Sequence, residues 1–389
     1  MNRNDVIIPK AMQLVLDDFG WFYGRDVRDQ GGPARAGFPR EFEIEDYEMM
    51  NEIGKAINQK VMGMFVVGEW DREGVLANVP NASWAGKNWN GSRWYNPEKA
   101  KQIVELYNRS ENLEWGVHGL LHDVWDENGG LLGGGEYFPF EGDVPSGKRI
   151  NPSEEYFRAH LDAYFKIYDT IGFKDRPRAF TAPCGGKTAL LSDIFAKTLK
   201  SYGLIYWHNT FEATPDGGKV ELGDHYIKDG TSVIRAAYVL CLWENYDLDP
   251  DELPEVTYET SGLIAGHWPN ILRFPPKKSK LNLPAWVDFF NRNAEIFGNM
   301  ISRDIAFAHK QYHYAKHSVI TEENGEVVID FSEVDALNPF GETPPVYISI
   351  KKSAAVPRFI GGEAKVYEEK NDFITYEVRR DSSGKIIVK

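Results

Sequence analysis

The chain contains little cysteine, no long apolar segment and no excess of positive charge. Cys184 and Cys241 are the only two cysteines among 389 residues, too few for a disulfide framework. No apolar run approaches the roughly 20 residues that span a bilayer, and the first residues show no secretory signal. A net charge of −14 makes nucleic acid and anionic membranes poor partners. We therefore expect a cytoplasmic protein, or an extracellular one present in its mature form, and leave the oligomeric state open.

The apolar residues are numerous and patterned, which excludes a disordered chain. They make up 42% of the sequence, enough for one large domain and a smaller one. Short apolar runs typical of buried strands alternate with helical patterns, which favours parallel pairing. The strands are expected at 12–16, 60–67, 113–119, 177–182, 203–209, 233–243 and 261–268, and the helices at 46–59, 96–107, 153–171, 188–202 and 286–317. The fold predicted for residues 1–318 is a distorted (β/α) barrel of parallel strands, and residues 319–389 predict a small antiparallel β domain.

The segment EWGVHGLLH places His118 and His122 four residues apart, directly after an apolar run. On one helical turn two imidazoles at this spacing face the same way and reach a single metal ion. Taken alone, such a pair is also typical of a helix surface or a core. Because Gly119 follows His118 where zinc proteases have glutamate, the protease pattern does not apply.

An acidic pair, Asp17 and Asp18, ends the first apolar run and precedes Phe19-Gly20. Alone, this pair could be a polar turn after a strand. Together with the later histidines it predicts a hydrolytic metal site with one carboxylate ligand, two imidazole ligands and open positions for water and substrate. In parallel barrels the chemistry gathers at the carboxyl ends of the strands. Several polar or turn residues fall at or just after predicted strand ends: Asp17, Asp18, His118, Pro183, His208 and His267.

Tryptophan and tyrosine are frequent in polar loops. Trp84, Trp89 and Trp94 lie in one Asn- and Gly-rich loop, and Trp243 lies in another. Flat rings with a polar edge suit carbohydrate binding, and the alternative is that they close the loops onto the barrel. Both interpretations stay open.

These motifs resemble the metal-dependent polysaccharide deacetylases of carbohydrate esterase family four, over roughly residues 10–315. Leu16-Asp17-Asp18-Phe19-Gly20 is similar to the family's Thr-Phe-Asp-Asp-Gly, with one residue inserted before the glycine. Residues 114–122 resemble its histidine motif. Residues 180–185 and 265–267 resemble its Arg-x-Pro-aromatic-Gly and Leu-x-His motifs less closely.

The resemblance implies a role for each matching residue. Asp18, His118 and His122 would hold a divalent metal, zinc by preference. Asp17 would be the general base for the attacking water, and His267 the general acid for the leaving group. A backbone N–H of the turn formed by Pro183, Cys184 and Gly185 would stabilise the oxyanion together with the metal.

Two departures from the family pattern bear on the mechanism. Thr181 replaces the arginine that orients the catalytic aspartate, and Arg178 lies on a different face of the same strand. Cys184 replaces the aromatic residue after the proline; we interpret it as a small buried residue, the alternative being a soft ligand or nucleophile.

Other residues have two interpretations each. His208, beside Trp207, is either a substrate or supporting group or a core histidine. Trp268 either walls the acyl pocket or fills the barrel mouth. The series His309, His313 and His317 imitates a metal-binding face; we interpret it as packing near a helix end.

The sequence therefore favours a hydrolase that removes an acyl group, acetyl above all, from an amide or ester on a carbohydrate. The predicted substrate contacts are Pro183, Cys184, Gly185, Trp207, His208, Trp243 and Trp268. One alternative keeps the metal but cleaves a small amide or a glycosidic bond. Another is a carbohydrate-binding protein without catalysis.

Overall fold

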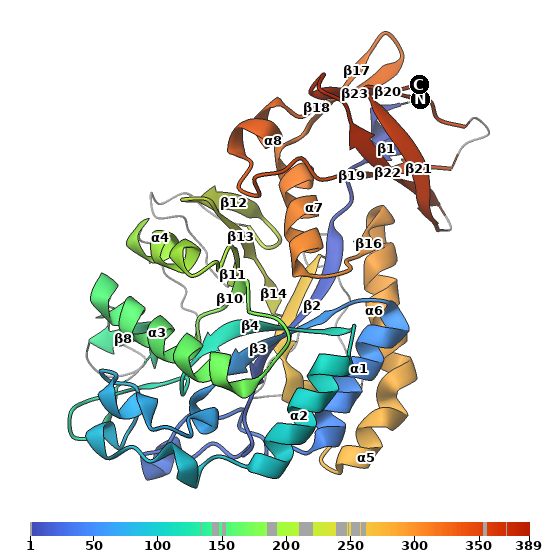
Figure 1. The fold of residues 1–389 in the computed structure, drawn as a ribbon. Coiled ribbons are helices and arrows are strands. Elements are labelled where there is room, and N and C mark those ends of the chain that lie inside the picture. The colour runs from blue at the N-terminus through green and yellow to red at the C-terminus, as the bar shows by residue number, and fades with distance from the viewer. Residues whose placement is uncertain are drawn as a thin grey trace.

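A curled β-sheet forms the centre of the molecule in the computed structural model (Figure 1). The structure describes residues 2–132, 134–141, 148–149, 153–184, 193–209, 221–238, 247, 249, 257, 262–352, 356–370 and 372–389. In spatial order the sheet consists of β12 (His225–Lys228), β13 (Thr231–Arg235), β11 (Tyr206–Asn209), β10 (Ala179–Phe180), β4 (Leu113–Gly119), β3 (Val61–Val66), β2 (Ala11–Phe19), β15 (Leu263–His267) and β14 (Ala237–Tyr238). A further strand, β16 (Met300–Ile301), pairs with the start of β2.

The prediction of an α/β fold around parallel strands is confirmed, but the predicted barrel does not close. Every neighbouring pair from β13 to β14 runs parallel, whereas β12 is antiparallel to β13. Within the described residues no pairing joins β14 to β12, so the sheet is an open half-barrel. The sequence pattern did not predict the antiparallel edge strand, because an apolar strand has the same pattern whether its neighbour runs parallel or antiparallel.

Helices surround this sheet, and their apolar faces make its core. They are α1 (Ile44–Ile57), α2 (Pro97–Arg109), α3 (Glu154–Ile171), α4 (Asp193–Ser201), α5 (Pro276–Ser279), α6 (Leu283–Glu295) and α7 (Ile305–His317), while α8 (Ser332–Leu337) packs in the C-terminal unit. In α2, for example, Ala100, Ile103 and Tyr107 are buried at helical spacing. The Asn96 side chain caps this helix by accepting a hydrogen bond from Lys99 N, and Pro97 fits its first turn.

The single helix predicted for 286–317 is wrong. The segment forms α6, then β16, then α7. Gly298 lies at φ 71 and breaks the helix, and Met300 pairs with Ala11 of β2. Asp304 then starts α7, its side chain accepting a hydrogen bond from Phe307 N at 2.8 Å.

The C-terminal residues form antiparallel sheets, as predicted. One sheet has the order β1 (Val6–Ile7), β19 (Val346–Lys351), β22 (Phe373–Arg380) and β21 (Gly362–Glu369); the other has the order β17 (Val319–Glu323), β18 (Glu326–Asp330), β23 (Lys385–Val388) and β20 (Phe359–Ile360). Because β1 pairs with β19, the amino-terminal residues belong to this unit, and both termini lie at the same end of the molecule (Figure 1).

Short strands also form between β4 and α3: β5 (Val124–Trp125), β6 (Leu131–Leu132), β7 (Gly134–Gly135), β8 (Phe138–Glu141) and β9 (Lys148–Arg149).

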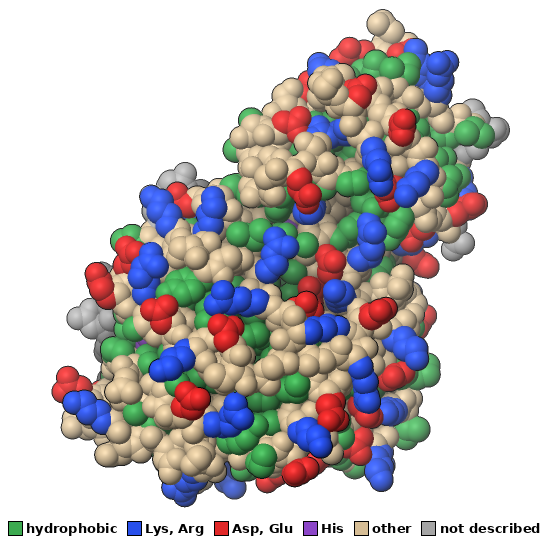
Figure 2. All heavy atoms as spheres, in the orientation of Figure 1, with side chains coloured by type: hydrophobic (Ala, Val, Ile, Leu, Met, Phe, Trp, Pro, Cys, Tyr) green, Lys and Arg blue, Asp and Glu red, His purple; other side chains and the backbone are tan. Residues whose placement is uncertain are grey.

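The surface carries both signs of charge. Figure 2 shows acidic and basic side chains interspersed over the face that it presents. Among the described residues, no helix has the length and hydropathy that crossing a bilayer requires.

A buried carboxyl group links β4 to the start of α7 and should make stability depend on pH. Glu114 Oε1 accepts a hydrogen bond from Ile305 N at 2.7 Å. Burial, with the charge of Asp304, raises the pKa of Glu114 from 4.5 to about 8. The folded protein therefore keeps a proton that the unfolded chain releases, so this contribution to the free energy of unfolding is complete below pH 4.5 and falls as the pH rises to about 8.

We expect Glu114→Gln to remove this dependence. Relative to the unaltered protein, the variant should gain about 1–3 kcal/mol of unfolding free energy between pH 5 and pH 8. Urea unfolding at both pH values measures the gain, and Glu98→Gln on the exposed side of α2 is the control. If the difference in unfolding free energy between Glu114→Gln and the unaltered protein were the same at pH 5 and pH 8, the raised pKa of Glu114 would be contradicted.

Candidate metal centre

The acidic pair lies in an irregular part of β2. Leu16 pairs with Gly63 but Phe19 pairs with Phe65, so one extra residue is accommodated between them. Asp18 has φ 71, which a non-glycine residue rarely adopts. Such a bulge interrupts the alternation of side chains along a strand and re-aims them. Here it leaves Asp17 and Asp18 buried at the carboxyl end of a central strand.

The two histidines lie at the carboxyl end of β4, which is separated from β2 by β3. His118 is the second-last residue of β4, and His122 lies in the bend after this strand. They do not share a helical turn, so the geometric reason first given for their pairing is wrong. His122 instead reaches the same place because its backbone turns back at φ 72. The ring centroids of the two histidines are 5.4 Å apart.

One carboxylate oxygen and two imidazole nitrogens converge as predicted. Asp18 Oδ1 lies 3.5 Å from His118 Nε2 and 3.6 Å from His122 Nε2. These separations are long for hydrogen bonds, yet two ligands bound at about 2.1 Å to one tetrahedral ion would lie roughly 3.4 Å apart. The three side chains could thus hold a metal ion with little movement.

The protein fixes the protonation pattern that a ligand set requires. The Nδ1 atom of His118 lies 2.9 Å from Thr181 O, so it carries the proton and leaves Nε2 free to ligate. Burial is the largest influence on Asp18 and raises its pKa. The attraction of the neighbouring imidazoles of His118, His122 and His267 outweighs burial, so the pKa of Asp18 falls below its usual range. Asp18 is therefore an anion at neutral pH. Thr181 therefore positions the His118 ring through its backbone carbonyl group.

A buried contact between Glu136 and His160 holds the loop between His118 and His122. Glu136 Oε2 accepts a hydrogen bond from Leu120 N at 2.6 Å, and Glu136 Oε1 lies 2.9 Å from His160 Nδ1. His160 Nε2 in turn lies 2.8 Å from Pro80 O. Gly119 is needed here, because a Cβ atom would lie 2.5 Å from Glu136 Oε2 at a φ of +145°. Sequence reasoning missed both members of this pair, since a lone glutamate in a Gly-rich segment carries no pattern.

We expect Glu136→Gln to weaken metal binding by about 10–100-fold, the usual effect of losing a supporting carboxylate. The loop would keep its backbone path but lose the charged anchor between the two ligands. Competition with a chromogenic chelator measures the affinity. Glu155→Gln on the exposed face of α3 should leave it unchanged; equal affinities for both variants would show that Glu136 does not position the ligands.

A second group of potential ligands adjoins the first. Cys184 Sγ lies 3.9 Å, and Asp123 Oδ1 3.8 Å, from His122 Nδ1. Cys184 is exposed, so its interpretation as a small buried residue is wrong. It also has positive φ, as do Asp18 and His122. Strained backbone at three neighbouring non-glycine residues is typical of functional sites.

One arginine reaches this side of the site, from the long loop after β2. Burial lowers the pKa of Arg28, but a hydrogen bond with Asp26 and the negative charges of Asp26 and Asp123 raise it overall. Arg178, in contrast, lies with its guanidinium 5.1 Å from the centre of the Tyr206 ring, and no role at the site follows for it.

Two further histidines border the centre. His267 ends β15 and is the register partner of Asp17, and its charge acts on Asp18. His208 is the second-last residue of β11 and is fully buried. Burial, followed by the charge of His118, lowers the pKa of His208 to about 3, so its ring is neutral at physiological pH. Neither ring nitrogen of His208 has a hydrogen-bond partner among the described residues. This is unusual for a core histidine and favours a supporting or substrate-facing role.

The predicted aromatic contacts are core residues in this structure. Trp268 stacks on Phe19 at 4.3 Å and on Phe42 at 4.4 Å between ring centroids, and Trp207 lies against Phe195 at 5.0 Å. Both tryptophans are fully buried, so we no longer assign them to the substrate. Pro183 is buried beside the exposed Cys184. Gly185 and Trp243 lie outside the described residues.

The tryptophans of the early loop mainly contact one another. The Trp84 ring lies 5.2 Å from that of Trp89, 5.6 Å from that of Trp94 and 5.6 Å from that of Trp125. Trp89 is buried, whereas Trp84 and Trp94 are half-buried. The cluster therefore closes the loop onto the body of the protein and leaves two rings partly accessible.

Comparison of the chain with protein-family models, with curated proteins and with solved structures found no match. The resemblance to polysaccharide deacetylases thus stays a prediction based on the motifs quoted above.

Proposed function

We propose that this protein is a metal-dependent hydrolase that removes an acyl group, acetyl above all, from an amide or ester on a carbohydrate. The observation that carries the proposal is the convergence of Asp18, His118 and His122, which are brought together from two strands 100 residues apart in the sequence. Two imidazoles and one carboxylate suit zinc, and three protein ligands leave a position for substrate or water.

The chain's own residues divide the proton transfers between them. A bound zinc-class ion would supply Lewis acidity that acidifies water and polarises a carbonyl group. Asp17 takes the proton from the attacking water, whose oxygen bonds to the acyl carbon. His267 gives a proton to the leaving nitrogen or oxygen as its bond to that carbon breaks. The pairing of Asp17 with His267 on adjacent strands supports this division.

Access to the centre is from the side of His122. The His122 side chain is 12% exposed, whereas the His118 and Asp18 side chains are each 2% exposed. The neighbouring Cys184 is exposed and Arg28 lies close by. An acyl group entering there would meet the ligand that is least covered, beside a positive charge suited to a developing oxyanion.

The experiment is to measure metal content and acetate release together. The purified protein should contain zinc, release acetate from N- or O-acetylated oligosaccharides, and lose this activity after dialysis against a chelator. His118→Ala should lose the ion held by Asp18, His118 and His122 together with the activity, and re-added zinc should not restore the activity. If no acetate is released from any sugar, release of amine from simple amides would indicate a small-amide hydrolase. Release of nitrophenol from nitrophenyl glycosides would instead indicate glycosidic cleavage. Sugar binding that survives chelation without turnover would favour a non-catalytic protein.

A further inference from the structure

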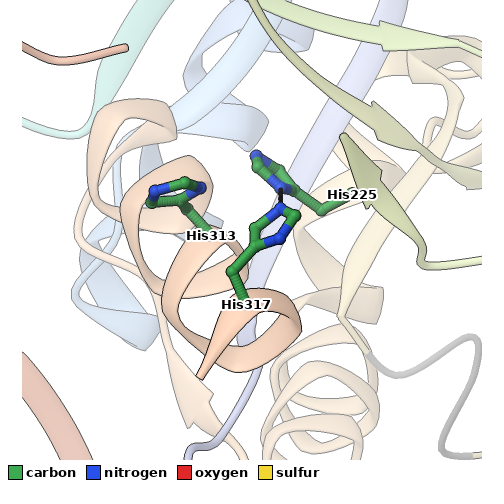
Figure 3. A group of neighbouring side chains, drawn as sticks. All are labelled: His225, His313 and His317. Carbon is green, nitrogen blue, oxygen red and sulfur yellow. Dashed lines mark hydrogen bonds between the residues drawn. The ribbon is translucent and has the colours of Figure 1, made fainter. Parts of the chain in front are cut away.

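A second group of histidines lies where the end of α7 packs against β12. The face of β13 toward α7 is opposite to the one that α4 covers. His313 and His317 come from α7, and His225 is the first residue of β12 (Figure 3). One ring nitrogen of each lies within 4.8 Å of one nitrogen of each of the others. His225 Nδ1 and His317 Nε2 are 3.4 Å apart. All three residues are buried, at 1%, 2% and 8% exposure for His225, His313 and His317.

The outer nitrogen of each ring is held by an oxygen atom. His225 Nε2 lies 2.8 Å from Ser232 Oγ, His313 Nε2 lies 2.9 Å from Val334 O, and His317 Nδ1 lies 2.8 Å from Glu333 Oε1. Metal-binding histidines are commonly supported in this way, by a carbonyl, hydroxyl or carboxylate that fixes the ring and its tautomer. All three rings of this cluster therefore have both a ligand atom directed inward and a supporting contact directed outward.

The hydrogen-bond partners decide where the protons lie. A carbonyl oxygen and a carboxylate only accept hydrogen bonds, so His313 Nε2 and His317 Nδ1 carry the ring protons. Their inward nitrogens, His313 Nδ1 and His317 Nε2, then present lone pairs. His313 Nδ1 is buried and has no hydrogen-bond partner among the described residues. His225 Nδ1 and His317 Nε2 contact each other at hydrogen-bond distance (Figure 3), whereas the lone pair of His313 Nδ1 is left unsatisfied by the described residues. A buried lone pair without a donor is costly, and a cation between the three rings would satisfy it.

From this geometry we infer that the protein has a second metal centre, formed by His225, His313 and His317 and selective for a zinc-class divalent ion. Three imidazole ligands match the preference of zinc and leave one position for water or a small anion. A cavity of about 250 Å³, lined by Asp224 and Lys316 among others, reaches His225. The ion would be structural, because it joins the edge strand of the central sheet to α7, while Glu333 and Val334 on α8 support it from the C-terminal unit.

This centre is independent of the proposed hydrolase site, and one background variant separates them. In His118→Ala/His122→Ala the first centre has lost two ligands. We expect this full-length protein to retain about one equivalent of zinc, and the additional change His317→Ala to remove it. His309→Gln is the matched control: His309 lies two turns earlier on α7 and contacts the same Ser232 at 2.8 Å, but is not one of the three ligands. It should retain the zinc.

Two further measurements cover the case in which His317→Ala does not fold. Cobalt titrated into the metal-free His118→Ala/His122→Ala protein should give visible absorption typical of a four-coordinate site, saturating at about one equivalent. Zinc should raise the melting temperature of this protein by several degrees, and a chelator should reverse the rise. Absence of bound zinc and of cobalt absorption would overturn the inference and assign the cluster to hydrogen bonding alone, with the proton on His225 Nδ1. If the unaltered protein contained zinc but His118→Ala/His122→Ala contained none, the second centre would be overturned and the first would stand.

Discussion

Asp17→Asn is expected to lower kcat by about 10²–10⁴-fold while the protein keeps its metal, because a general base contributes this much to a hydrolysis. Asparagine preserves the shape of the side chain but cannot accept the proton of the attacking water. Since Asp17 is adjacent to a ligand but is not itself in the ligand set, the three groups around the ion stay in place. Acetate release measured with saturating substrate gives kcat, and elemental analysis of the same sample gives the metal content.

Asp18→Asn is the informative comparison, since the two aspartates are neighbours on one buried strand. Its amide is a poor metal ligand, so we expect loss of turnover and of the ion held at this centre. If Asp17→Asn retained full activity, or if both variants lost metal equally, the division of roles between base and ligand would be wrong.

Arg35→Ala is expected to lower the free energy of unfolding by about 3–5 kcal/mol, the cost of leaving a buried charge without its partner. Arg35 Nε lies 2.7 Å from Glu69 Oε1, and the two side chains are 3% and 1% exposed. Glu69 Oε2 also accepts a hydrogen bond from Phe22 N at 2.7 Å. Burial raises the pKa of Glu69 most strongly, and Arg35 opposes the rise. The pair therefore anchors the long loop after β2 to the turn after β3.

The surface provides a matched control for this substitution. Arg292 pairs with Asp288 at 2.8 Å on α6, but the side chains are 65% and 66% exposed. Arg292→Ala should cost less than about 0.5 kcal/mol, because water screens an exposed pair. Urea unfolding of both variants gives the comparison. In addition, Arg35→Ala/Glu69→Gln should recover part of the loss; a double variant no more stable than Arg35→Ala would show that the isolated charge is not the cause.

Local sequence patterns predicted the parts of the candidate site that lie at the ends of apolar strands. Asp18 and His118 follow such runs, so their position at one edge of a parallel sheet could be inferred. His122 does converge with Asp18 and His118, but the reason given for this from the sequence was wrong. Its place depends on a backbone turn at φ 72, and a four-residue spacing does not distinguish that turn from a helix. The tryptophans were misjudged because ring accessibility depends on which other rings cover them.

By itself, the sequence determined the chemistry available and the periodicity of the elements: an acidic pair after one strand, a histidine pair after another, and alternating helices and strands. Only the tertiary structure decided which distant residues meet. It brought His225 to His317, 92 residues later, it set Glu136 against His160 beneath the ligand loop, and it left the sheet open at β12. The physical reason is that periodicity records whether a side chain is buried, while its partners depend on the path of the intervening chain and on close packing, which no local pattern contains.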